Sequence, residues 1–332
     1  MHSSRVEMER CFICSIDSAK EFVDYNEYHP DPDSELYQYM IQLFARNFDN
    51  IGAKKCYFKM DSFISTILPE QVEGFDAFVD AVADEMHSLV QEAVDLPSGA
   101  GLFLWATVDE QPIIAFFKLN FQDRFSCVVG EDGTVNWNKQ MRLLPTSTQK
   151  DYDFFYINIL DRKVWMSDMR CHIDNESVNY MADRILQLNL EKSEKEEVKN
   201  FETAVIDTIK ECYKNDAPQK VFEYRQSVLE EVEDTGDISP EKVQEVVFAD
   251  NEEARTVYKE KMEELEIPQK PVSVSNKTKR QFKKKQKIVT ENGIEILVPI
   301  EYLEDKNVFD YRQDPSGKVS IVIKDTSSDV KL

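Results

Sequence analysis

Glycine is scarce in this sequence, with nine residues in 332. The nine form no GxGxxG or Walker A pattern, the glycine-rich loops that hold nucleotide phosphates. The sequence also contains no GxSxG nucleophile elbow and no HExxH zinc motif. The signatures of common nucleotide-binding and hydrolytic enzymes are therefore missing, and we expect a non-enzymatic protein without a cofactor.

Cysteine and histidine are scarce as well, with six and four residues. Cys11 and Cys14 have CxxC spacing, but they lie in an alternating, strand-like run and no second CxxC follows. The histidines do not cluster along the chain. We therefore predict no metal site, and we expect reduced cysteines that behave as small apolar residues.

Long apolar runs are absent too. The longest, Gly101–Val108 and Pro112–Leu119, are far shorter than the roughly 20 residues of a membrane-spanning helix. The N-terminus reaches Glu7 and Glu9 at once and lacks the apolar region of a signal peptide. These features predict a cytoplasmic protein with no membrane partner.

Positive charge is in deficit, since 40 basic residues face 63 acidic ones and the formal net charge is −23. One segment departs from this balance: 277–287 carries seven cations and no acid. Just upstream, Glu230–Glu266 has fourteen acidic residues against four basic ones. An acidic surface repels phosphate, so any contact with nucleic acid has to be local. The candidate nucleic-acid-binding residues are Lys277, Lys279, Arg280, Lys283, Lys284, Lys285 and Lys287.

The first half of the chain predicts a mixed domain with an antiparallel sheet flanked by helices. Apolar residues at helical spacing predict helices from Ser34 to Phe48 and over about 74–95. No helix separates the later strands, so an antiparallel meander fits better than a parallel sheet. Strands are predicted at about 6–16, 101–108, 112–119, 124–129, 136–144, 153–160 and 163–167.

The second half predicts helices and then a small β element, which makes the fold class α+β. Asp174 is expected to cap a helix with Val178, Met181, Ile185 and Leu188 on one face. Further helices are predicted at about 193–213, 217–233, 240 onward and 251–265, and strands between 294 and 323. Ser239 is expected to be the N-cap of the helix that starts at Pro240. We predict a mixed domain at 1–170, a helical region at 171–267, and a basic segment plus β element at 268–332.

Several stretches resemble a known family, namely Gly101–Trp105, Ile113–Leu119, Val178–Leu190, Gly293–Leu297, Asn307–Asp310 and Lys318–Lys324. In these stretches, and in the order of its elements over most of its length, the chain resembles the bacterial nucleoid-associated proteins typified by NdpA. The resemblance implies a cytoplasmic, nucleoid-associated protein that binds DNA. None of the stretches is a catalytic signature.

The basic segment is open to three interpretations. One of them, a targeting tract, matters only in a eukaryotic cell, whereas the resemblance points to bacteria. Lys277, Arg280, Lys284 and Lys287 follow helical spacing, so a helix capped by Ser273 or Ser275 would present a row of cations to phosphates. Lysine outnumbers arginine, which favours phosphate contact over base reading and predicts low sequence specificity. Phe282 is expected to dock such a helix on the protein. Alternatively, the segment is a solvated linker helix whose cations pair with the acidic helices upstream.

Two other functions stay open at this stage. The first alternative is an adaptor whose acidic helices bind a DNA-processing enzyme. In the second it is a metal-dependent nuclease, although in so acidic a chain nuclease-like carboxylate spacings arise by chance. A homodimer would double a modest basic patch, and the sequence leaves oligomeric state and DNA strandedness open.

Overall fold

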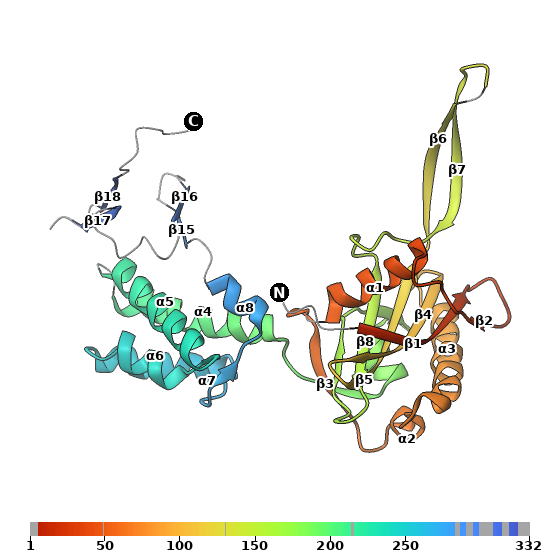
Figure 1. Ribbon diagram of the computed structural model, residues 1–332. Helices are drawn as coiled ribbons and strands as arrows, with labels where there is room; N and C mark the ends of the chain where they lie inside the picture. Colours follow the sequence, from red (N-terminus) through yellow and green to blue (C-terminus); the bar gives the residue numbers. More distant parts are fainter. Residues whose placement is uncertain are drawn as a thin grey trace. The chain divides into compact units, whose positions relative to one another are not determined.

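The computed structural model describes residues 6–48, 50–129, 131–213, 216–282, 286–289, 295–298, 308–313 and 319–324. The chain divides into two compact units, Met1–Glu194 and Lys195–Leu332 (Figure 1). The predicted α+β class is confirmed. In the described part of the chain, no helix combines the length and the apolar character needed to cross a bilayer.

Unit 1 is built on an eight-stranded antiparallel sheet with the strand order β12-β3-β9-β8-β5-β4-β1-β2. The long central pair β4–β5 is the predicted hairpin. The strands are β1 Val6–Ile16, β2 Asp24–Glu27, β3 Lys54–Phe58, β4 Gly99–Val108, β5 Gln111–Asn120, β8 Tyr152–Asn158, β9 Val164–Met166 and β12 Leu188–Leu190. Strand β12 belongs to the predicted helical region, 171–267, but lies in this sheet. The division of the chain into three parts stays a prediction.

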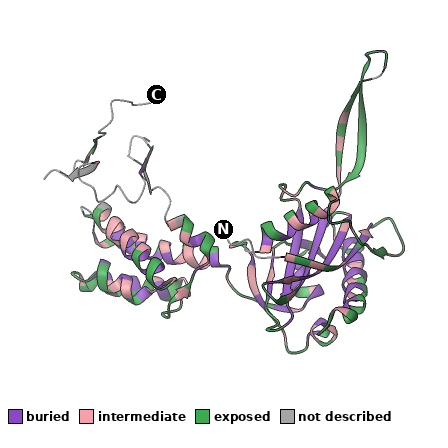
Figure 2. Cartoon of the chain, viewed as in Figure 1, coloured by how far each residue is buried: buried purple, intermediate pink, exposed green. Residues whose placement is uncertain are grey.

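Helices cover both faces of this sheet, which explains why its central strands are apolar throughout. Phe103 and Trp105 of β4 lie in the core beneath α3 (Phe75–Glu92). The alternate residues Leu102 and Leu104 lie in the core with α1 (Glu35–Phe48). Strands covered on both faces have continuous apolar sequences, and Figure 2 shows them as buried. The two helices agree with the prediction. The Ser34 hydroxyl accepts from the Tyr37 N–H and caps α1.

The predicted meander needs one correction. Strands β6 (Gln122–Val129) and β7 (Val135–Leu143) pair with each other and not with the sheet, so β5 pairs directly with β8. The β6–β7 hairpin projects from the rest of unit 1 (Figure 1). Its strands lack the continuous apolar character that a place inside the covered sheet requires.

The helix predicted to start at Asp174 is wrong. Strands β10 (Cys171–Ile173) and β11 (Glu176–Val178) form a hairpin around Asp174 and Asn175, whose φ angles are 50° and 67°. Positive φ at both central residues is the requirement of a tight hairpin turn, and Asp and Asn tolerate it well. A π-helical turn, Tyr180–Ile185, follows, capped by the Asn179 side chain. The remaining short elements of unit 1 are α2 Phe63–Ile67 and the 3₁₀ turn Val72–Gly74.

Unit 2 holds a helical core formed by apolar residues of α4 to α7 and of the segments that join them, including Phe201, Tyr224, Phe248 and Tyr258. The predicted N-cap at Ser239 is confirmed, because its hydroxyl accepts from the Lys242 N–H. The helices are α4 Glu194–Cys212, α5 Ala217–Asp234, α6 Pro240–Val247, α7 Glu252–Glu264 and α8 Asn276–Phe282.

Short antiparallel ladders complete unit 2. Strands β13 (Asp237–Ile238) and β14 (Val272–Ser273) pair just before α8. Near the C-terminus β15 (Gln286–Val289) pairs with β16 (Glu295–Val298), and β17 (Phe309–Gln313) pairs with β18 (Val319–Ile323). The predicted C-terminal β element is therefore confirmed.

Candidate nucleic-acid interface

The basic segment begins as the short helix α8, and the chain fixes where this helix starts. The β13–β14 ladder ends at Ser273. The Ser275 hydroxyl then accepts from the Thr278 N–H at 3.4 Å, and the Ser275 carbonyl accepts from the Lys279 N–H at 2.9 Å. Of the two serines considered from the sequence, Ser275 is therefore the cap, since a serine side chain satisfies a free N–H of the first helical turn.

One side of α8 docks on the helical core of unit 2. Thr278 is 1% exposed, and Phe282 packs against the core cluster. This confirms the docking role predicted for Phe282. Lys277 and Arg280, three residues apart, are exposed. Residues three apart are neighbours on a helix surface, so these two cations form an exposed pair.

Lys279 lies between the exposed and buried sides of α8, over the end of α5. A methyl group added at Gly236, whose φ is 85°, would come within 2.7 Å of the Lys279 Nζ. Lys279 and Arg280 also line a pocket of about 340 Å³ together with Val232, Glu233 and Asn276. Two cations at one pocket can donate hydrogen bonds to phosphate oxygens, while the Glu233 that also lines it makes the pocket less favourable to anions.

The acidic helices of unit 2 use other cations for their ion pairs. Lys220 Nζ contacts Glu223 at 3.0 Å and Asp250 at 3.3 Å. Similar pairs join Arg225 to Glu202, Arg255 to Glu252 and Lys261 to Glu211. Within the described part of unit 2, no ion pair involves Lys277, Lys279 or Arg280. For these three side chains, the structure gives no support to pairing with the acidic helices.

The row of cations predicted along one helix is interrupted. Helix α8 ends at Phe282, and Lys287 lies in strand β15, opposite Leu297 of β16. The continuation of one helical face to Lys287 is therefore wrong. The β-branched pair Ile288-Val289, which follows Lys287, favours a strand. Lys283, Lys284 and Lys285 lie outside the described residues.

Sequence reasoning did not single out a second charged cluster, which lies in the core of unit 1. Lys118 and Asp153 are opposite each other on β5 and β8 and are 0% and 3% exposed. Lys118 Nζ donates to the Pro97 carbonyl at 2.7 Å and to the Asn120 amide oxygen. The Tyr180 hydroxyl donates to one carboxylate oxygen of Asp153. A lysine and an aspartate within apolar strands are the signals that could have revealed this pair.

Burial controls the protonation of this cluster. It lowers the pKa of Lys118 to about 8 and raises the pKa of Asp153. The pKa of Tyr180 is also raised, by burial and by the adjacent Asp153. Because Lys118 is fully buried, the cluster cannot contact a phosphate backbone. Across the described residues, no group of three or more His, Cys, Asp or Glu is placed to hold a metal ion.

Comparison with known proteins bears on the predicted family. No curated protein is similar enough to the chain to count as a match. A family model described as nucleoid-associated protein YejK matches residues 23–331. This match includes most of unit 1 and nearly all of unit 2, and it confirms the resemblance found in the sequence. The chain therefore belongs to this family of bacterial nucleoid-associated proteins.

Proposed function

We propose that this protein is a non-enzymatic, cytoplasmic DNA-binding protein of the bacterial nucleoid that contacts phosphates through the basic segment, residues 277–287. Family membership supports a role at the nucleoid. The observation that carries the assignment to this segment is its charge. It has seven cations and no acid in a chain of net charge −23, and Lys277 and Arg280 are exposed on α8.

The chemistry of these cations favours binding without sequence specificity. Six of the seven are lysines. A lysine ammonium acts as a point charge on a phosphate, whereas bidentate reading of a base is typical of arginine. Contact with about five phosphates of duplex DNA gives a slope of about −4.5 in a plot of log affinity against log salt concentration.

Charge reversal tests this proposal. Two variants, Lys277→Glu/Arg280→Glu and Lys283→Glu/Lys284→Glu/Lys285→Glu, are titrated with labelled duplex and single-stranded DNA between about 50 and 200 mM salt. Each lost phosphate contact removes about 0.9 from the slope, so we expect slopes flatter by about 1.8 and 2.7. Higher affinity of the wild type for one DNA form would identify the preferred strandedness.

The matched control is Lys199→Glu/Lys259→Glu, which makes the same change in net charge as the α8 variant at exposed lysines of α4 and α7. We expect this control to lose little affinity, since long-range repulsion between exposed charges is screened by salt. Equal losses in control and α8 variants would mean that net charge, and not the basic segment, governs binding.

The acidic helices favour a second candidate function. Glu241, Glu245, Glu252, Glu253 and Glu260 of α6 and α7 are exposed and could bind a basic surface of a DNA-processing protein. An adaptor of this kind retards DNA in a gel only when its partner is present. Retardation by the isolated protein supports the first proposal instead. A nuclease would cleave plasmid DNA when Mg²⁺ or Mn²⁺ is added, and we expect intact plasmid.

A further inference from the structure

The β6–β7 hairpin (Gln122–Leu143, hereafter the ribbon) has one apolar face and one polar face. Residues directly opposite each other in an antiparallel pair share a face. The pairs Phe125–Lys139, Cys127–Trp137 and Val129–Val135 therefore lie on one face, here called the apolar face. The pairs Arg124–Gln140, Ser126–Asn138 and Val128–Asn136 lie on the other. By alternation, Met141 continues the apolar face.

The apolar face is uncovered in the single chain. Trp137 is 73% exposed and Phe125 is 67% exposed, and Figure 2 shows both ribbon strands as largely exposed. Alternation of apolar and polar residues is typical of a ribbon that buries one face, and a lone two-stranded ribbon is only marginally stable in water. A contiguous exposed apolar patch of this kind marks an interaction site.

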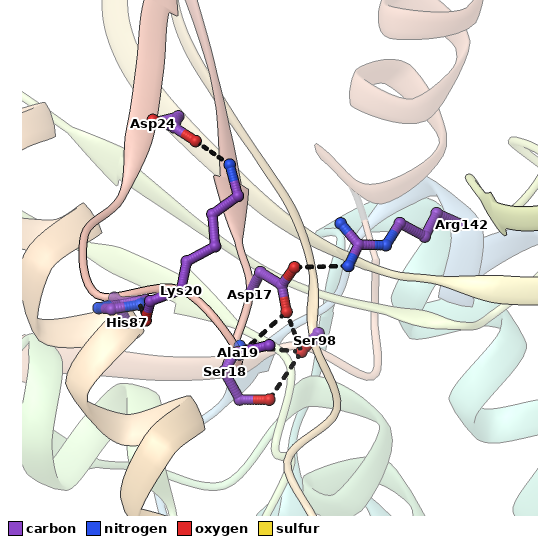
Figure 3. Close-up of polar contacts among 8 residues, drawn as sticks. All are labelled: Asp17, Ser18, Ala19, Lys20, Asp24, His87, Ser98 and Arg142. Carbon is purple, nitrogen blue, oxygen red and sulfur yellow. Dashed lines mark hydrogen bonds and ion pairs between the residues drawn. The ribbon is translucent and has the colours of Figure 1, made fainter.

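The base of the ribbon is tied to the sheet, so its direction is defined. Arg142 Nη2 contacts Asp17 Oδ2 at 2.7 Å, and its guanidinium lies 5.8 Å from the Phe121 ring centre. Asp17 is itself held by the Ala19 N–H and by the Ser98 hydroxyl (Figure 3). Arg124, on the polar face, donates to the Gln149 side chain at 2.6 Å. None of these contacts involves Phe125, Cys127 or Trp137 of the apolar face.

The charge of the ribbon favours a second copy of the chain as its partner. The segment 122–144 has three acidic residues (Asp123, Glu131, Asp132) and three basic ones (Arg124, Lys139, Arg142), so its net charge is zero, whereas the chain carries −23. Two copies of so acidic a chain repel each other, and a neutral ribbon is where they can approach with least repulsion. DNA is a poorer occupant. The turn carries Glu131 and Asp132, and Lys139 already pairs with Asp123 at 2.6 Å.

The exposed aromatic area would supply a large part of a self-association interface. With about 150–250 Å² for a whole aromatic side chain, Trp137 and Phe125 expose roughly 300 Å² together. Two copies would bury roughly 600 Å² of aromatic surface, half of the approximately 1,200 Å² at the lower end of specific interfaces. Val129, Val135 and Met141, each between 59% and 65% exposed, add to this area.

We propose that the apolar faces of two ribbons pack against each other and join two copies of this chain in a two-fold dimer. A two-fold interface uses the same patch on both copies. The apolar face meets that requirement, since it runs over both strands, with Cys127 and Trp137 near its centre. The dimer contains two basic segments, but its existence does not depend on DNA binding.

Sedimentation velocity on the full chain tests the dimer. The variant Phe125→Ser/Trp137→Ser removes the two aromatic side chains of the apolar face. The matched control Val128→Ser/Asn136→Ser changes an opposing pair on the polar face. We expect dimers for the wild type and the control at about 10 μM and at least a tenfold weaker dimer for the apolar-face variant. A monomeric wild type at 100 μM, or equal dimerisation of the two variants, overturns the proposal.

Cys127 provides a second readout that does not depend on folding of the variants. Of the six cysteines it is the one that is exposed, since four are buried and Cys212 is intermediate. A short bismaleimide should crosslink two wild-type copies through Cys127, and Cys127→Ser should abolish the product. Absence of crosslinking overturns the proposal. Quenching of Trp137 fluorescence by oligo-dT, with weaker DNA binding by Phe125→Ser/Trp137→Ser, assigns the ribbon to DNA and also overturns it.

Discussion

Unit 1 contains two successive hairpins of similar length that end in opposite environments. The β4–β5 hairpin lies at the centre of the sheet, and its residues Phe103 and Phe116 are 0% exposed. The β6–β7 ribbon follows directly in the chain and exposes Phe125 and Trp137. Apolar side chains on both faces require a cover on both sides, which α1 and α3 supply. The alternating ribbon has one apolar face, and one surface brought by a second copy is enough to cover it.

The comparison shows that an aromatic residue in a strand has no fixed energetic value. Its contribution depends on whether both faces of its strand are covered. All three tryptophans, Trp105, Trp137 and Trp165, belong to unit 1. Urea unfolding followed by tryptophan fluorescence therefore reports on unit 1, at a concentration low enough to keep copies apart.

The largest effect is expected from Phe116→Ala. The Phe116 ring lies 4.5 Å from the Phe103 ring centre and 5.2 Å from that of Phe155. Loss of this side chain should lower the free energy of unfolding by about 3–5 kcal/mol, because a cavity remains in the core. The matched variant Phe125→Ala should change it by less than about 0.5 kcal/mol. Equal losses for the two phenylalanines would contradict the contrast between the hairpins.

The second effect concerns the buried pair of Lys118 on β5 and Asp153 on β8. Lys118→Met leaves the Asp153 carboxylate without its neighbouring cation and should cost about 3 kcal/mol. The double variant Lys118→Met/Asp153→Asn should be more stable than this single variant, because no unpaired charge is left in the core. Strictly additive losses in the urea measurement would show that the two groups do not interact.

The same pair predicts a dependence on pH. The pKa of Lys118 is lowered from 10.5 to about 8 by burial. Between these values the unfolded chain binds more protons than the folded one, so this group makes unit 1 more stable as pH rises through the window. The free energy of unfolding of the wild type relative to Lys118→Met should therefore increase from pH 8 to pH 10.5. A constant difference would contradict the burial of a charged lysine.

A smaller effect is expected at the base of the ribbon. Arg142→Ala removes the contact with Asp17, and because the Arg142 side chain is 54% exposed, the loss should be below about 1 kcal/mol. The pKa of Asp17 is lowered by the Ala19 N–H and by Arg142. The stabilisation that the Asp17 carboxylate contributes is therefore present above pH 3.8, the ordinary pKa of aspartate, and is lost as pH falls through the lowered pKa of Asp17 in the folded chain. Limited proteolysis should cut the ribbon faster in this variant than in Lys139→Ala, whose ion pair lies within the ribbon.

The smallest effect distinguishes the two turns. Asp109 and Glu110 close the β4–β5 hairpin with φ of 48° and 67°, whereas the ribbon turn places Gly133 at a φ of 79°. Glutamate is strained in this conformation and glycine is not. Glu110→Gly should therefore stabilise unit 1 by about 0.5 kcal/mol, despite the added freedom of the unfolded chain. Destabilisation in the urea measurement would contradict this reading of the turn.

Local patterns predicted most of the fold because most elements follow one clear periodicity. The strand Val6–Ile16, the α1 and α3 helices and the Ser239 cap are as expected. One helix assignment and one strand pairing were wrong for physical reasons. The spacing of Met181, Ile185 and Leu188 fits a helix. In the structure, however, Met181 and Ile185 are buried in the π-helical turn and Leu188 is buried in β12, after the tight hairpin turn at Asp174 and Asn175. The ribbon strands were predicted, but pairing partners are not encoded in periodicity.

The sequence predicted which residues of the candidate site are cationic, but not how the structure divides them between a helix and a strand. Charge alone singled out the seven cations, and Ser275 and Phe282 take the roles expected of a cap and a docking residue. The separation of Lys277 and Arg280 on α8 from Lys287 on β15 was not foreseen. Lysines fit both helices and strands when exposed, so their spacing cannot decide between the two.

The central claim is that the basic segment, and not the ribbon, binds DNA. The salt dependence of duplex DNA affinity for Lys277→Glu/Arg280→Glu, set beside that of Phe125→Ser/Trp137→Ser as monomers, tests it most directly. We expect a slope flatter by about 1.8 for the α8 variant and an unchanged slope for the ribbon variant. An unchanged slope for the α8 variant, with a flatter one for the ribbon variant, would contradict it.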